Sequence, residues 1–337
     1  MGNKVSTASR KHRLLAPLRS SSSLTTRRKK KNKQSPSPSS TAYSTTTTAS
    51  SISSNPSISD SVVRQGRAFH NISDSIYWLP HDDEEIDRLV GQHFALKALF
   101  EGNVAKEVLP TLEKGAKILD VGCGPGTWIM DLATEFPGCE FYGIDFSDMF
   151  PSDIRPPNVQ FLHANVLERL PFEDNTFDFV NMRFFMLALR HEEWLIALKE
   201  IHRVLKPGGF FQSLESGMMD RGNDFCLWVG GIFMNVMRER GQEPYIAFKL
   251  KELMEQVNID FIKSDQRDTY LSKTDQLNRE FLWDIVNIVR SAQPFLTGPL
   301  GITPDKFPQF LKRFEHECKQ PPGAQWLIAI NLGQKPF

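Results

Sequence analysis

The sequence predicts an α/β protein built on a doubly wound, mostly parallel seven-stranded sheet. Short apolar segments of strand length alternate with segments of helical periodicity from residue 83 onward. A glycine-rich loop follows the first of these strands and an aspartate ends the second, as expected at the ligand-binding edge of such a sheet. Strands joined through helices run parallel with right-handed crossovers, so the alternation predicts the fold class.

The first half of this region contains most of the expected sheet. A helix over Asp83–Phe100 has apolar residues at helical spacing, and Asp82 followed by Glu85 gives it a start that resembles a capping box. The strand Lys117–Val121 then leads into the glycine loop. The further elements are helices over 127–136 and 192–205 and strands over 140–145, 159–163, 177–181 and 209–215.

Helices outnumber strands after residue 215. The helix expected over 303–319 has Thr303 as its N-cap and Pro304 at its first position. We interpret residues 216–259 and 275–319 as helical insertions that form a substrate cap with an apolar underside. The remaining elements are helices over 225–240, 245–257 and 277–292 and strands over 261–271 and 326–332.

Charge divides the chain into two unlike parts. Of the 40 basic and 40 acidic residues, 13 bases and one acid lie in residues 1–70, which leaves 27 bases and 39 acids for residues 71–337. Ser and Thr account for 25 of the first 60 residues, and apolar residues there show no period. Residues 1–70 are therefore predicted to be a disordered basic tail, and residues 71–337 one acidic domain that is not expected to bind nucleic acid directly.

The N-terminus carries a pattern of its own. Met1-Gly2-Asn3-Lys4-Val5-Ser6 fits the pattern for N-myristoylation of Gly2. One acyl chain binds membranes only marginally, and the basic residues within 10–33 supply a second signal for an anionic surface. The favoured localisation is therefore cytoplasmic with membrane association. The alternatives are a nuclear-localisation patch, a transit peptide and a merely solvated tail.

Several classes of protein are excluded by composition. Four scattered cysteines form neither a disulfide framework nor a zinc-spaced cluster, so a reducing compartment and no metal site are expected. No apolar run approaches the ~18 residues of a membrane-spanning helix.

The glycine loop carries the chemistry. Gly122, Gly124 and Gly126 let the backbone approach a ligand, but Thr127 stands where a dinucleotide fingerprint needs glycine, which disfavours a nicotinamide oxidoreductase. Asp145 ends the second strand, where a carboxylate can accept both ribose hydroxyls. Asp120 places a second carboxylate under the loop. Two acids suit a ribose-bearing, positively charged cofactor such as S-adenosylmethionine.

The motifs resemble those of class I (Rossmann-like) SAM-dependent methyltransferases over about residues 115–216. The resemblance rests on residues 118–126, Tyr142-Gly143-Ile144-Asp145, 164–166, 170–172, 177–180 and 204–209. The flanks resemble a narrower group, the fungal LaeA/UMTA-type methyltransferases. They do so at Tyr77-Trp78-Leu79-Pro80, Asp82–Glu85, Arg88-Leu89, Gln92-His93, Met182-Arg183 and Gly333-Gln334-Lys335-Pro336.

The resemblance implies a set of cofactor contacts. The three loop glycines would pack against the methionine part of S-adenosylmethionine, with Asp120 near its ammonium and Asp145 on its ribose. Asn165 would meet the adenine amino group, where many family members have Asp. Val166 would contribute its backbone N–H and an apolar face, and Tyr77 is a further candidate contact.

The catalytic residues are less well defined. His191, Glu215 and Arg183 are candidates for substrate contact or base chemistry, although methyl transfer from a sulfonium needs mainly alignment and desolvation. The methyl acceptor is expected to be a small molecule or a protein. The alternative is a SAM-binding, LaeA-like regulator of secondary metabolism and development with little external catalysis.

Overall fold

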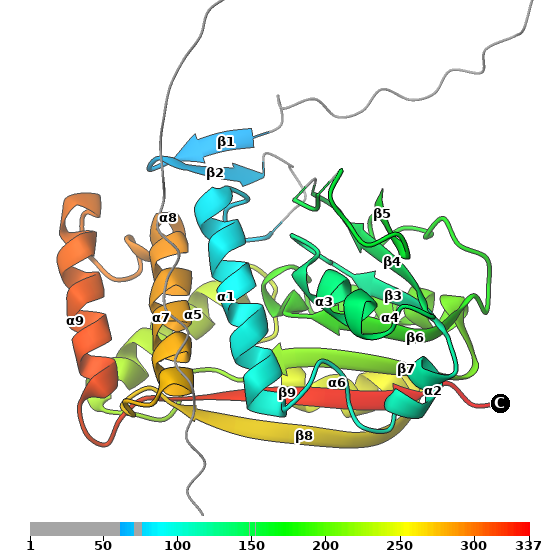
Figure 1. The fold of residues 1–337 in the computed structure, drawn as a ribbon. Coiled ribbons are helices and arrows are strands. Elements are labelled where there is room, and N and C mark those ends of the chain that lie inside the picture. Colours follow the sequence, from blue (N-terminus) through cyan, green and yellow to red (C-terminus); the bar gives the residue numbers. More distant parts are fainter. Residues whose placement is uncertain (1–60, 71–75, 148, 152) are drawn as a thin grey trace, which may run out of the picture. The chain divides into compact units, whose positions relative to one another are not determined.

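The computed structural model describes residues 61–70, 76–147, 149–151 and 153–337 (Figure 1). The expectations for Gly2, for the basic residues within 10–33 and for the rest of residues 1–60 lie outside this set. Strands β1 (Ser61–Arg64) and β2 (Arg67–His70) pair as an antiparallel hairpin, so the prediction of a disordered tail is wrong for residues 61–70. The Gln65-Gly66 turn has positive φ at both residues, which suits a tight hairpin.

The central sheet has the strand order β5-β4-β3-β6-β7-β9-β8. The five strands from β5 to β7 are parallel, whereas β9 runs antiparallel to both β7 and β8. The predicted seven-stranded, mostly parallel sheet is therefore confirmed. Its strands are β3 (Lys117–Val121), β4 (Glu140–Asp145), β5 (Val159–His163), β6 (Phe177–Arg183), β7 (Leu205–Ser216), β8 (Asp260–Tyr270) and β9 (Gln325–Gln334).

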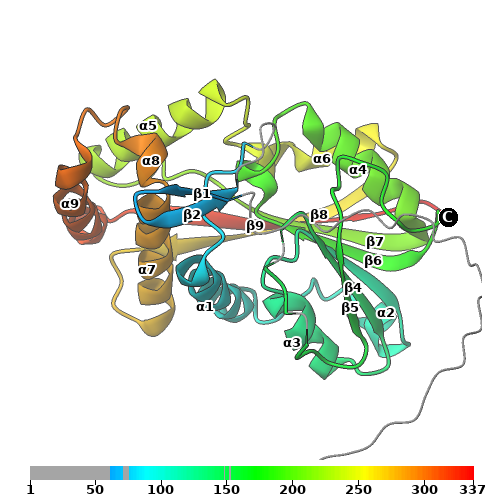
Figure 2. The ribbon, with the colours of Figure 1, turned by 90° about the horizontal axis from the view of Figure 1, so that it is seen from above.

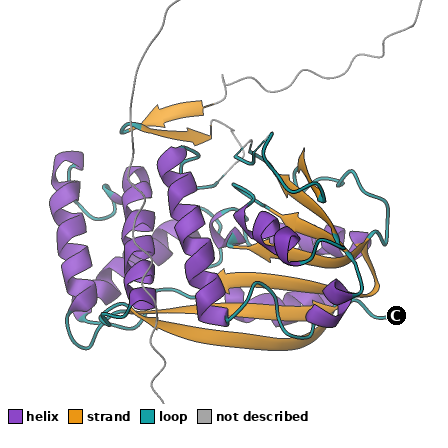
Figure 3. Ribbon diagram, viewed as in Figure 1, coloured by secondary structure: helices purple, strands orange, loops and turns teal. Residues whose placement is uncertain are grey.

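Helices cover both faces of the sheet. Figure 2 shows α1, α3 and α7 on one side and α4, α5 and α6 on the other, and Figure 3 separates helices from strands. The α-helices are α1 (Asp83–Phe100), α2 (Leu109–Glu113), α3 (Thr127–Glu135), α4 (Glu193–Val204), α5 (Asp224–Glu239), α6 (Ile246–Gln256), α7 (Gln276–Ser291), α8 (Gln293–Leu296) and α9 (Phe307–Lys319). Two 3₁₀ turns, η2 (Phe185–Leu187) and η3 (Pro304–Lys306), complete the elements described below.

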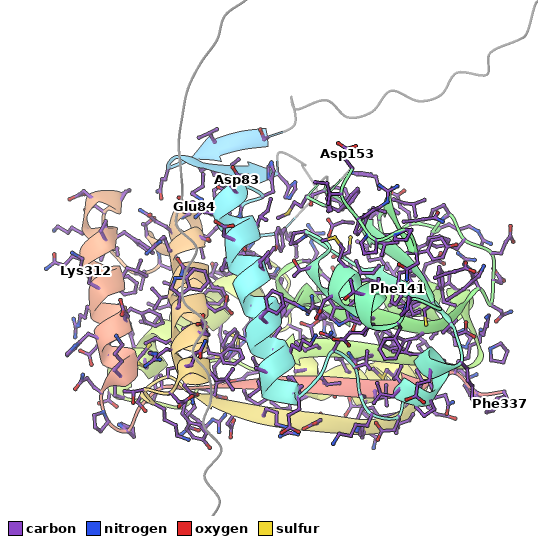
Figure 4. The ribbon with its side chains drawn as sticks, in the orientation of Figure 1. Asp83, Glu84, Phe141, Asp153, Lys312 and Phe337 are labelled. Carbon is purple, nitrogen blue, oxygen red and sulfur yellow. The ribbon has the colours of Figure 1, made fainter. Side chains whose placement is uncertain are left out.

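The start of α1 agrees with its sequence. Asp82 accepts a hydrogen bond of 3.1 Å from the backbone N–H of Glu85, and Asp83 and Glu84 open the helix with negative charge that its dipole favours (Figure 4). Arg67 in the hairpin also pairs with Asp82 at 2.6 Å. The cap therefore joins the N-terminal hairpin to the helix.

The last helix begins later than predicted. Residues Pro304–Lys306 form a 3₁₀ turn, α9 starts at Phe307, and the Thr303 side chain caps neither element. Pro308 explains the difference, because a helix running through it from residue 304 would lose one hydrogen bond and clash with a carbonyl one turn earlier. The short helices α2 and α8 were not predicted, since four or five residues show no period.

Successive side chains of β3 pack on opposite faces of the sheet. Ile118 packs with Trp128 of α3 in one buried cluster, whereas Leu119 packs with Trp194 of α4 in the other. Phe141 on β4 belongs to the first cluster (Figure 4). Packing on both faces thus holds the carboxyl end of β3 and the start of α3, between which the glycine loop lies. In the described part of the chain, no helix combines the length and hydropathy needed to cross a membrane.

Candidate functional site

A cavity of about 500 Å³ lies at the carboxyl ends of the parallel strands. Its walls come from the loops after β3, β4, β5 and β6, from residues 77–92, and from helices α5 and α7. Strand order reverses on the two sides of β3, so the cavity occupies the position where a doubly wound sheet binds its ligand. Its volume is within the ~300–1,000 Å³ of small-molecule sites.

The three glycines of the loop differ in the space around them. All have positive φ, but a Cβ at Gly122 would lie 2.4 Å from the Phe185 ring and one at Gly126 would lie 2.6 Å from Phe161. At Gly124 the nearest atom to such a Cβ is 3.8 Å away, on Leu89. Gly122 and Gly124 line the cavity, whereas Gly126 lies behind it as the N-cap of α3.

Asp145 lines the cavity and holds the loop at the same time. Its Oδ2 accepts the Gly124 N–H at 2.7 Å, and its Oδ1 accepts the Ser147 N–H at 2.8 Å and the Ser147 hydroxyl at 2.9 Å. Burial raises its pKa, while these donors oppose the shift. The Ser147 hydroxyl can rotate away, which would leave both oxygens able to accept a vicinal diol.

Asp120 lies beneath the loop and is 2% exposed. Its Oδ1 accepts a hydrogen bond of 2.8 Å from Asn181, and its Oδ2 is buried with no hydrogen-bond partner among the described residues. Burial raises the pKa of Asp120 to about 6, while Arg183 and Asn181 act in the opposite direction. A buried carboxylate oxygen without a donor is costly unless a ligand satisfies it.

Arg183 ends β6 and lines the cavity near Asp120. Its guanidinium lies 5.9 Å from the centre of the Trp128 ring and 3.5 Å from Nδ1 of His93. Nε2 of His93 lies 3.0 Å from Asp131, and burial lowers the pKa of His93 to about 4. A neutral His93 that donates to Asp131 can therefore accept from Arg183.

The remaining predicted cofactor contacts also reach the cavity. Tyr77, Asn165 and Val166 all line it. Oδ1 of Asn165 already accepts the Leu167 N–H at 3.0 Å, so one further lone pair is left for a ligand. Among the eight predicted contacts, Asp120 and Gly126 are not part of the cavity wall.

Two of the three catalytic candidates lie away from the cavity. The His191 side chain is 55% exposed, with Glu243 at 3.9 Å, and it is not part of the cavity wall. Glu215 is fully buried and accepts the N–H groups of Phe185 and Met186 at 2.8 and 3.1 Å. It therefore holds the turn η2, which forms part of the wall, rather than touching a substrate itself.

A buried charge cluster was not predicted as part of the site. Arg88 pairs with Glu85 and with Asp284 at 2.6 Å each, and Gln92 donates to the other oxygen of Asp284 at 2.8 Å. Arg88 and Gln92 line the cavity. The spacing 85, 88 and 92 marks one face of α1, but Asp284 is 192 residues further on, and no local pattern connects them.

No group of His, Cys, Asp and Glu residues in the described ranges is arranged to hold a metal ion. The groups at the glycine-loop end of the cavity are the carboxylates of Asp145 and Asp120, the backbone of the loop, and the guanidinium groups of Arg88 and Arg183.

Residues 118–209 match the family model described as a methyltransferase domain. A demethylmenaquinone methyltransferase of Staphylococcus aureus is 43% identical over 112 residues, which are 31% of this chain and 45% of that protein. The chain thus spans less than half the length of the curated relatives it matches. The strand order and the matched segment agree with the class I methyltransferase fold.

The structure was also compared with solved structures, and two of the similar ones are methyltransferases. One is phosphoethanolamine N-methyltransferase 2 of Haemonchus contortus in complex with S-adenosyl-L-methionine, with 17% identity and a TM-score of 0.44, covering 80% of this chain and 62% of that one. Another is a SAM-dependent methyltransferase from Methanosarcina mazei, with 17% identity and a TM-score of 0.42, covering 69% and 99%.

Proposed function

We propose that the chain is a SAM-dependent methyltransferase. The observation that carries the proposal is the pair of carboxylates at the glycine loop: Asp145 in the cavity wall, and Asp120 beneath the loop with a buried oxygen to which no described residue donates. A ribose diol fits the first and an ammonium fits the second. The matched methyltransferase domain contains both residues.

The residues present fit S-adenosylmethionine. Asp120 would attract its ammonium from beneath the loop, Asp145 would bind its ribose, and Asn165 with Val166 would bind its adenine, while Gly122 and Gly124 would leave room for its methionine part. The cofactor supplies a methyl group activated on a sulfonium. The protein then has to orient the acceptor and exclude water, which the cavity walls can do without a dedicated base.

The experiment is a titration of the purified full chain with S-adenosylmethionine, followed by labelled-methyl transfer to a cell extract. Asp145→Asn should weaken binding by about ten-fold or more, since it replaces a charged acceptor. Asp178→Asn is the matched control, because Asp178 holds Lys117 and Lys206 outside the cavity. Equal binding by both variants would contradict the proposed site.

The narrower grouping with LaeA/UMTA-type proteins is part of the same proposal. Its support is that Tyr77, Arg88, Gln92 and Arg183, which carry the flanking resemblance, all line the cavity. Binding of S-adenosylmethionine without transfer to any component of the extract would favour the regulator over the enzyme.

We also propose that residues 1–33 bring the protein to an anionic membrane surface. The support is Gly2 in a myristoylation pattern together with ten Lys and Arg residues in 10–33. A Gly2→Ala variant should leave the membrane fraction, and its retention there would contradict the proposal. The acidic domain is not proposed to bind nucleic acid.

A further inference from the structure

We propose that the methyl acceptor is a small, uncharged and predominantly apolar molecule bound under the cap formed by α5 and α7. This inference rests on the proposed function and names the substrate class of the same site. It excludes peptide side chains and charged metabolites as the preferred acceptors.

The cavity changes character beyond the glycine loop. Its wall there is made of side chains from helices far apart in the sequence, and these are almost all apolar. This apolar wall includes Val229 and Phe233 of α5, Ile285, Ile288 and Val289 of α7, and Trp326 of β9.

Two charged residues of the cavity wall neutralise each other. Arg190 and Glu193 line the cavity, and they form a salt bridge with each other at 2.7 Å. The Ser216 hydroxyl contacts the sulfur of Met186 at 3.0 Å. An ionic acceptor among the apolar side chains of α5 and α7 would therefore lose its water of hydration, and Arg190 and Glu193 already have each other as partners, so its binding there is costly.

The cap is packed closely enough to define a shape. A Cβ at Gly230 would lie 2.1 Å from the carbonyl oxygen of Met219, so α5 lies directly against the loop after β7. The Phe233 ring stacks on Trp78 at 4.8 Å between centres. Trp78 is held in turn by a hydrogen bond of 2.7 Å from its Nε1 to Gln242. A peptide substrate would require this packing to open.

The test compares two probes with the same ring system. The purified full chain is titrated calorimetrically with 2-naphthol, which is uncharged, and with 2-naphthoate, which carries a carboxylate, each with and without saturating S-adenosylhomocysteine. We expect 2-naphthol to bind at least about ten-fold more tightly, because the naphthoate charge loses its solvation. Equal or tighter binding of 2-naphthoate would overturn the inference.

Two variants locate the probe. Val229→Thr and Val289→Thr keep the side-chain shape but place a hydroxyl in the wall from α5 and from α7, and each should weaken 2-naphthol binding by about ten-fold. Leu227→Thr is the matched control, since Leu227 is on the same helix as Val229 but 40% exposed. Unchanged binding in both cavity variants would overturn the inference.

The two proposals fail in different ways. If S-adenosylhomocysteine does not bind while 2-naphthol does, the proposed cofactor is wrong and the apolar site remains. If S-adenosylhomocysteine binds but 2-naphthol does not, the methyltransferase proposal stands and the acceptor class is wrong. S-adenosylhomocysteine affinity should be unchanged in the Val229 and Val289 variants.

Discussion

Asn181 on β6 donates a hydrogen bond of 2.8 Å to Oδ1 of Asp120 on β3. The two residues face each other in the parallel register, and Gln212 on β7 occupies the next position and donates to Asn181 at 3.1 Å. A chain of amides across three adjacent strands thus orients one carboxylate. It satisfies only one oxygen, so the other is left for a ligand.

This geometry predicts how cofactor binding depends on pH. The pKa of Asp120 is raised to about 6 by burial, and only the ionised carboxylate attracts an ammonium. The affinity for S-adenosylmethionine should therefore fall by about ten-fold between pH 7.5 and pH 5. Calorimetric titration at both values measures this change, and an equal affinity at both would contradict it.

A change at Asn181 tests the same relationship. Asn181→Leu removes the donor that favours the ionised form, so the pH dependence should move upward, and stability should fall by about 1–3 kcal/mol. Asn331→Leu is the control. Asn331 is also buried, but it lies on β9 and donates to the Ala247 carbonyl of α6. It should lose stability while keeping the wild-type pH dependence.

Two alanine substitutions in the glycine loop should differ in severity. Each puts a side chain at positive φ, at a cost of about 1–2 kcal/mol. Gly122→Ala should cost clearly more, because its Cβ would lie 2.4 Å from the Phe185 ring, whereas Gly124→Ala meets nothing closer than 3.8 Å. Urea unfolding compares the two, and equal losses would contradict the predicted contact.

Glu215 should make the stability of the fold depend on pH. Burial raises its pKa to about 8, although the N–H groups of Phe185 and Met186 favour the carboxylate. Between about pH 4.5 and 8 the folded chain keeps a proton that the unfolded chain has lost. Glu215 thus makes the free energy of unfolding fall with rising pH, by about 1 kcal/mol per unit, and this contribution levels off above pH 8.

Glu215→Gln should remove this slope, measured as chemical denaturation from pH 5 to pH 9. Glu113→Gln, at an exposed position of α2, should keep it. A wild-type slope in the Glu215 variant would show that another group is responsible.

Removing only the cation from the cluster of Glu85, Arg88 and Asp284 should lower the free energy of unfolding much more than replacing all three residues together. Arg88→Met leaves two buried carboxylates without their cation and should destabilise the fold by about 3–5 kcal/mol. Replacing all three by Leu, Met and Leu should recover much of that loss. Urea unfolding measures both variants. A free energy of unfolding of Arg88→Met within about 1 kcal/mol of wild type would contradict the prediction.

His191 should be dispensable. Its side chain is 55% exposed outside the cavity wall, so His191→Ala should change stability by less than about 0.5 kcal/mol and leave the rate of labelled-methyl transfer within about two-fold. A large loss of transfer with unchanged S-adenosylmethionine affinity would return His191 to the list of catalytic candidates.

Local patterns predicted the sheet well, because β3, β4 and β6 are largely apolar and the strands lie between clear breaks. The strands β3, β4 and β5 begin and end where expected. The prediction of disorder was wrong for residues 61–70. These residues form the hairpin of β1 and β2, which is stabilised by contacts outside its own sequence, such as Arg67 with Asp82. The predicted start of α9 was wrong because Pro308 prevents a continuous helix from residue 304.

The sequence by itself determined the alternation of the main strands and helices, the glycine loop and the acids at the ends of β3 and β4, because these depend on spacing along the chain. Only the tertiary structure decided which distant side chains meet there. It brought α5 and α7 over the cavity, joined Asp284 to Arg88, placed Phe185 against Gly122 and turned His191 outward. Such contacts arise from packing between elements far apart in the chain, and no local periodicity encodes them.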